Sequence, residues 1–128
     1  MPLMSVPLAK AITALNVLVA SGFALAGLIH PQAILPPGDA PTPAAAIFAM
    51  YAAARTIPLA VFVLVAIFRN WRRTLVVLGA LAGTIQSLDF LIGLAQHDAG
   101  KTIGPLVLAA LQFAAVYSLA RESDVRKI

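Results

Sequence analysis

The sequence contains no cysteine and few charged residues. Without cysteine, disulfide frameworks, thiolate catalysis and cysteine-based metal sites are excluded. Charged residues make up 11% of the 128 residues, whereas apolar residues make up 61%. A water-soluble domain of this length needs more Lys, Arg, Asp and Glu to cover its surface. We therefore expect lipid to be the solvent for much of the surface of one domain, residues 1–128.

The net charge of +4 does not indicate a nucleic-acid partner. The basic residues lie at the edges of apolar runs, whereas a nucleic-acid interface needs them clustered on one folded surface. Basic loops beside apolar runs are typical of contact with anionic lipid headgroups. The sequence also lacks glycine-rich phosphate loops and recognisable catalytic motifs, so no cofactor is predicted.

Four apolar segments are each near the ~20 residues that a membrane-spanning helix needs. They cover residues 11–29, 44–68, 74–95 and 102–120. The first has the outline of a signal peptide, but its apolar run to Ile29 is longer than a usual signal core, so we expect it to span the membrane.

Polar or proline-rich stretches separate the four segments. Residues 30–43 hold five prolines, which interrupt helices, and residues 69–73 and 96–101 read as short turns. Residues 121–128 form a charged tail. The predicted fold is all-α, a bundle of four transmembrane helices that run up-down-up-down.

The distribution of lysine and arginine predicts the orientation. If the segments alternate in direction, one side of the membrane receives all but one of the basic residues that lie at segment ends. They are Lys10, Arg69, Arg72, Arg73, Arg121, Arg126 and Lys127, against Lys101 alone on the other side. This asymmetry puts both chain ends and the arginine-rich turn in the cytoplasm.

Two ionisable residues inside the segments stand out, Arg55 and Asp89. An ionised group near the middle of a bilayer costs at least about 2.5 kcal/mol on insertion scales unless it has a partner. Counted from the turn at residues 69–73, Arg55 lies ~20 Å and Asp89 ~23 Å along their helices. We therefore expect the two to form an ion pair at one depth.

Gln86 and Tyr51 are expected close to this pair, because each lies within one helical turn of a charged residue. These four polar residues have two interpretations. In the first, they form a buried ion pair that only fixes the register of two helices. In the second, they form a ligand-binding centre, since intramembrane ionisable residues often belong to pathways or ligand sites. Both stay open, and the four residues are candidates for ligand binding.

His30 and His97 are candidates at the outer mouth, near Asp39, Asp98 and Lys101. No metal-binding spacing is present, so no metal site is predicted. The alternatives are proton relay towards Asp89 and, more simply, solvated histidines at helix ends.

Two further polar groups and a glycine pair concern packing. Asn16 and Gln112 lie ~8–12 Å from the cytoplasmic helix ends, which predicts a hydrogen bond between their helices. Gly79 and Gly83 form a GxxxG pattern, which allows close helix approach, here within the chain rather than in a dimer.

The stretches from Tyr51 to Arg55, from Gln86 to Phe90 and from Gln112 to Arg121 resemble the small four-helix DoxX-like membrane proteins. Those proteins share an arginine early in the second helix, a short basic turn and an acidic residue late in the third helix. The resemblance implies a four-helix bundle in the inner (cytoplasmic) membrane of a bacterium, and some relatives are accessory subunits in quinone-coupled oxidation. It implies Arg55 and Asp89 as candidates and does not itself establish a function.

The leading hypothesis is a multi-pass inner-membrane protein that binds a lipophilic small molecule, quinone- or isoprenoid-like, at an Arg55–Asp89 centre. One alternative is a small membrane enzyme that uses Asp89 as acid or base. Another is an accessory subunit of a larger membrane complex, without a site of its own. A cavity of at least about 300 Å³ favours ligand binding, and a filled interior favours the accessory subunit. A homo-oligomer or another membrane protein as partner stays open.

Overall fold

The computed structural model describes residues 3–125. These form four long helices, α1 (Val6–Ile29), α2 (Pro43–Phe68), α3 (Arg72–Ala95) and α4 (Ala99–Val125), and one 3-10 turn, η1 (Pro31–Ala33). All four α-helices are long and apolar enough to cross a membrane. The prediction of an all-α protein with four candidate membrane spans is confirmed for the described part of the chain.

The helices α1, α2 and α4 begin before the apolar runs of the sequence, each directly after a capping residue. The side chains of Ser5 and Thr42 accept backbone hydrogen bonds in the first turns of α1 and α2, and Asp98 does the same for α4. Such caps satisfy amide groups that the helix itself leaves unpaired. At the other end, α4 continues to Val125, so the predicted charged tail is helical there, and its last residues, 126–128, lie outside the described part.

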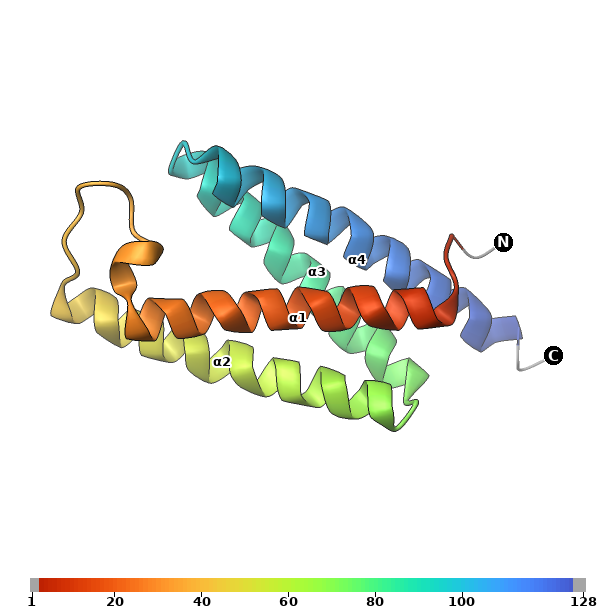
Figure 1. The fold of residues 1–128 in the computed structure, drawn as a ribbon. Helices are drawn as coiled ribbons and strands as arrows, with labels where there is room; N and C mark the ends of the chain where they lie inside the picture. Colours follow the sequence, from red (N-terminus) through yellow and green to blue (C-terminus); the bar gives the residue numbers. More distant parts are fainter. Residues whose placement is uncertain (1–2, 126–128) are drawn as a thin grey trace.

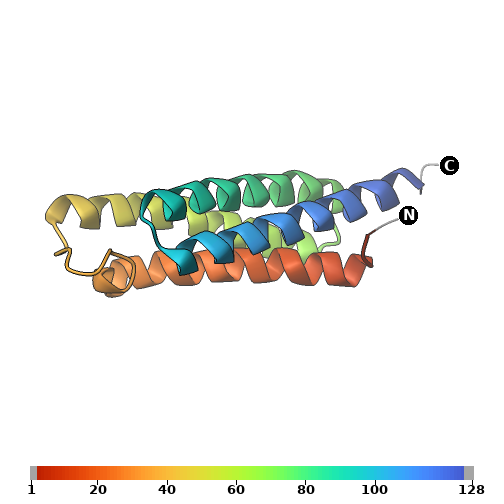
Figure 2. The ribbon, with the colours of Figure 1, turned by 90° about the horizontal axis from the view of Figure 1, so that it is seen from above.

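The helices form two packed pairs, α1 with α2 and α3 with α4, which meet where α1 crosses α4 (Figure 1). The start of α1, the end of α4 and the α2–α3 turn lie at one end of the bundle, which we call the closed end. The α1–α2 loop and the α3–α4 turn lie at the other, the open end. From the α2–α3 turn, α2 and α3 diverge towards the open end (Figure 1). Figure 2 shows the α1–α2 loop at the end of the bundle opposite the start of α1 and the end of α4.

Glycines allow α3 and α4 to lie close together. A Cβ added to Gly79 would lie 2.9 Å from Gln112 Nε2, and one on Gly83 would lie 3.0 Å from the Phe113 ring. Both glycines of the GxxxG pattern therefore receive side chains of α4, which confirms that the pattern serves packing within the chain.

The buried apolar core lies towards the closed end. Leu75, Leu119 and Val63 are fully buried there, within a cluster that all four helices supply. Lys10 adds a hydrogen bond of 2.8 Å to Asn70 in the α2–α3 turn. Because the core is confined to this end, the divergence of the helix pairs leaves space at the other.

Candidate functional site: a cavity between the helix pairs

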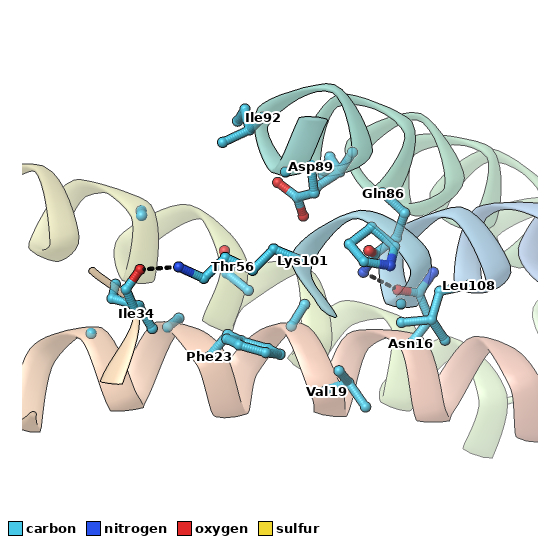
Figure 3. A pocket seen from close by; sticks show the side chains of 18 of the residues that line it. Asn16, Val19, Phe23, Ile34, Thr56, Gln86, Asp89, Ile92, Lys101 and Leu108 are labelled. Atoms are coloured by element: carbon cyan, nitrogen blue, oxygen red, sulfur yellow. Dashed lines mark hydrogen bonds between the residues drawn. The ribbon is translucent and has the colours of Figure 1, made fainter. Parts of the chain in front are cut away.

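A cavity of about 500 Å³ lies between the two helix pairs, on the open side of the core. All four helices and the α1–α2 loop line it. Most of the lining is apolar, and the exceptions are few (Figure 3). The polar or charged lining residues are Asn16, Thr56, Gln86, Asp89, Gln96 and Lys101.

Asp89 is the acidic residue of the cavity wall. Its carboxylate points from α3 into the space between the pairs (Figure 3). The side chain is half-buried, and within residues 3–125 no hydrogen bond or ion pair joins the carboxylate to another group. A carboxylate in this position can accept a hydrogen bond or pair with a positive charge.

The floor of the cavity is a buried network of amide side chains. Gln86 Nε2 donates to Asn16 Oδ1 at 2.7 Å, and Asn16 Nδ2 donates to Gln112 Oε1 at 3.0 Å. Gln112 Nε2 then donates to the Thr13 hydroxyl at 3.0 Å, and that hydroxyl donates to the Ala9 carbonyl. The predicted Asn16–Gln112 bond is confirmed, and Gln86 carries the network from α1 and α4 to the cavity.

Lys101 and Ile34 border the outer part of the cavity. Lys101 Nζ donates to the Ile34 carbonyl at 2.6 Å and to Gln96 Oε1 at 3.2 Å, so one ammonium ties the α1–α2 loop to the α3–α4 turn (Figure 3). The Ile34 side chain rests on α1 at Gly27, where an added Cβ would lie 2.8 Å from Ile34 Cδ1.

Asp98 supports the same corner from outside the cavity lining. Its Oδ1 accepts the Lys101 backbone N–H at 3.1 Å, and its Oδ2 lies 3.6 Å from Lys101 Nζ. The backbone hydrogen bond, and then the charge of Lys101, lower the pKa of the Asp98 carboxyl. The carboxylate therefore stays ionised as the cap of α4 and as a partner of Lys101.

Exposed lining residues open the cavity on two sides of the gap between the helix pairs. On the side of α2 and α3 they are Ala52, Ile85 and Ile92, and on the side of α1 and α4 they are Phe23 and Gly104. In a bilayer, openings along the apolar spans face the acyl chains of the lipids, so an apolar molecule can enter without crossing water.

The predicted Arg55–Asp89 ion pair does not form among the described residues. Arg55 is exposed on the outer surface of α2, where it donates to the Tyr51 carbonyl at 3.3 Å and lies 5.7 Å from the centre of the Tyr51 ring. Neither Arg55 nor Tyr51 lines the cavity. The distance of a residue along its helix does not say which way its side chain points about the helix axis. The side of α2 that faces the cavity carries Ala52, Thr56 and Leu59, and Arg55 is not on it.

Neither of the two histidines, His30 and His97, lines the cavity. His30 ends α1 and His97 lies in the α3–α4 turn with φ 54°, and both are exposed and absent from the lining. Nowhere in residues 3–125 do three His, Cys, Asp or Glu residues gather as metal ligands.

Three groups of this site are hard to predict from the sequence. The position of Asn16 predicts a role in helix packing, but its amide also orients Gln86 at the cavity floor. Thr56 lies on the α2 wall, and its helical spacing from Ala52 could have indicated a shared face. The contact between Lys101 and the Ile34 carbonyl has no sequence signal, because it depends on how the loop folds back.

No family model, no curated protein and no solved structure matches this chain. The resemblance to DoxX-like proteins therefore stays a prediction. Fold and site together define a class, a four-helix protein with candidate membrane spans and a mostly apolar cavity, in which the Asp89 carboxylate has no partner among residues 3–125.

Proposed function

We propose that this protein is a multi-pass protein of a bacterial inner membrane that binds a lipophilic small molecule, quinone- or isoprenoid-like, in the cavity beside Asp89. In this proposal both chain ends and the arginine-rich turn are cytoplasmic. The open end then faces outward, and the ligand enters from the outer leaflet between α2 and α3.

The observation that carries the proposal is a mostly apolar cavity with a few polar groups, among them Asp89 and Gln86 side by side on α3. Its volume of about 500 Å³ exceeds the lower size of about 300 Å³ for ligand pockets. An accessory subunit without a site has no need for such a space, because a filled interior gains packing energy. The cavity therefore favours ligand binding over that alternative.

The polar groups favour a ligand with a long apolar body and a small polar head. Asp89 and Gln86 lie three residues apart on one face of α3, where they can hold a hydroxyl or carbonyl head. The apolar side chains from α1 and α4, such as Phe23 and Leu108, are suited to an isoprenoid tail (Figure 3). Acid–base catalysis by Asp89 on the same ligand stays a prediction.

The test is ligand extraction and binding with the full chain in a mild detergent. Native mass spectrometry of the purified protein detects a bound molecule, and titrations with decylubiquinone and geranylgeraniol measure affinity for the two ligand types. Asp89→Asn removes the charge and keeps the shape. Asp39→Asn, in the exposed α1–α2 loop, is the matched control.

A second variant adds bulk at the wall of the cavity. Gly104 lines it, and a Cβ added there meets no atom within 4 Å, so Gly104→Leu adds an apolar side chain at the cavity wall without a clash at its Cβ. We expect Asp89→Asn to weaken binding about tenfold or more, Gly104→Leu to abolish it, and Asp39→Asn to bind as wild type. Equal binding by all four proteins, or no binding by folded wild type, contradicts the proposal.

A further inference from the structure

Arg55 poses a physical problem that the single chain does not solve. It lies near the middle of α2, ~18 Å from the start of the helix and ~20 Å from its end. Its side chain is exposed, and its described partners are the carbonyl and the ring of Tyr51. A guanidinium that faces hydrocarbon costs at least about 2.5 kcal/mol on insertion scales, and one carbonyl and one ring do not replace its hydration.

Snorkelling lowers this cost but supplies no counter-charge. The side chain extends towards Tyr51, in the direction of the open end. With the arginine-rich turn at one edge of a hydrocarbon core about 30 Å thick, Arg55 at ~20 Å from that turn lies ~10 Å from the other edge. The guanidinium can approach that edge, but only a carboxylate within the membrane neutralises its charge at its own depth.

The surface around Arg55 has the composition of a protein interface. Phe48, Tyr51 and Phe62 share its face of α2, and their exposed fractions are 73%, 57% and 62%. Aromatic residues and arginine are enriched at the centres of protein–protein interfaces. Lipid contact alone does not require this combination.

Asp89 carries a negative charge without a partner among the described residues, at about the same depth as Arg55. It lies ~20–25 Å from the α2–α3 turn along α3, and Arg55 lies ~20 Å from the same turn along α2. Its carboxylate has no partner within the described residues, and it lies in the cavity that opens between α2 and α3. Within the described membrane-spanning segments, each chain thus carries a positive charge on the exposed surface of α2 and a negative charge in the cavity beside α2 and α3, and no ion pair neutralises either of them.

From these observations we propose that two copies of the chain associate through their α2–α3 faces, with Arg55 of each copy paired to Asp89 of the other. A two-fold axis along the membrane normal keeps depth unchanged, so groups at one level in a chain meet at that level in the dimer. Two ion pairs form, and both charges of each copy are neutralised. The partner's α2 also covers the opening of the cavity on the side of α2 and α3.

This inference does not rest on the proposed ligand, because the charges need partners whether or not the cavity is occupied. Charge reversal separates pairing between copies from pairing within one copy. Copies with Arg55→Asp place Asp opposite Asp89 in a homodimer, and copies with Asp89→Arg place Arg opposite Arg55. A mixed pair of these two variants restores both ion pairs between copies and none within either copy.

The experiment co-expresses two differently tagged full-length copies, captures one tag from mild detergent and quantifies the other. We expect wild type to capture wild type, and each variant to capture itself about tenfold less, because like charges face each other. The mixed pair and the double variant Arg55→Asp/Asp89→Arg return close to the wild-type level. Rescue by the double variant without rescue by the mixed pair overturns the proposal in favour of a pair within one chain.

A second measurement does not depend on charge reversal. Because the chain has no cysteine, one copy carries only Tyr51→Cys and the other only Ile92→Cys, two exposed positions just outward of the charged residues. We expect cross-linking between these copies in native membranes. Val107→Cys, exposed on α4, replaces Tyr51→Cys in the control pair and is expected to give none.

Three further results overturn the proposal. They are wild-type chains that fail to capture each other, Arg55→Asp copies that capture themselves as well as wild type does, and equal cross-linking in the two cysteine pairs. A monomer that loses bound anionic phospholipid when Arg55 becomes Gln would identify a lipid phosphate as the partner of Arg55 instead of a second copy.

Discussion

The closed and open ends of the bundle differ in whether their polar side chains have hydrogen-bond partners within the chain. Towards the closed end, the amides of Asn16 and Gln112 donate and accept within a continuous network, and the apolar core packs beside this network. Towards the open end, the helix pairs separate and the Asp89 carboxylate faces a cavity with no partner from the described chain. A polar group that is satisfied internally holds helices together, whereas one left unsatisfied is available to another molecule.

The bundle keeps its helix packing although one end is open. The crossing of α1 and α4 and the close approach of α3 and α4 do not depend on the cavity. Stability and binding therefore depend largely on different residues of one small bundle, although Gly93 both lines the cavity and packs against α4, and variants should separate the two properties.

The largest effect is expected from forcing α3 and α4 apart at the open end. A Cβ on Gly93 would overlap the Lys101 carbonyl, which is backbone and cannot rotate away. Gly93→Ala should destabilise the protein by about 1–3 kcal/mol or more, measured by unfolding in mixed micelles. Gly22→Ala is the control, since its Cβ meets nothing within 4 Å and alanine favours helix by up to about 1 kcal/mol. Equal stability of the two variants would show that the helices can separate at little cost.

A smaller effect is expected from breaking the network towards the closed end. Gln112→Leu leaves the Asn16 amide without its acceptor in a fully buried position. We expect a loss of about 1–2 kcal/mol in the free energy of unfolding. Adding Asn16→Leu should then cost less than it does in the wild-type background, because the two side chains share one interaction. Strict additivity would mean that the two amides act independently.

The smallest effect is expected at the outer corner of the cavity. Lys101→Met removes the hydrogen bond to the Ile34 carbonyl and keeps the length of the side chain. Global stability should change by about 1 kcal/mol or less. Amide hydrogen exchange in the α1–α2 loop should become faster, as at Asp39, which donates to the Pro36 carbonyl. Unchanged exchange in the loop would show that Ile34 is held by its contact with Gly27 alone.

The two predicted polar contacts show how far sequence reasoning reaches. Both used depth along the helices, and the Asn16–Gln112 contact is confirmed whereas the Arg55–Asp89 contact within one chain is wrong. The difference lies in rotation and separation. Asn16 and Gln112 face each other where α1 crosses α4, but Arg55 lies on the outer surface of α2, and α3 has diverged from α2 at that level (Figure 1).

The amino-acid sequence by itself determined the four apolar helices, their breaks at prolines and polar turns, and the presence of ionisable groups at one depth. These features follow from local composition and from the rise per residue, which act along one chain segment at a time. Only the tertiary structure decided that Asp89 faces a cavity, that Gln86 joins the network of Asn16, and that Arg55 points away from both. Those outcomes depend on crossing angles and on which face each helix presents, and packing among all four helices sets them together.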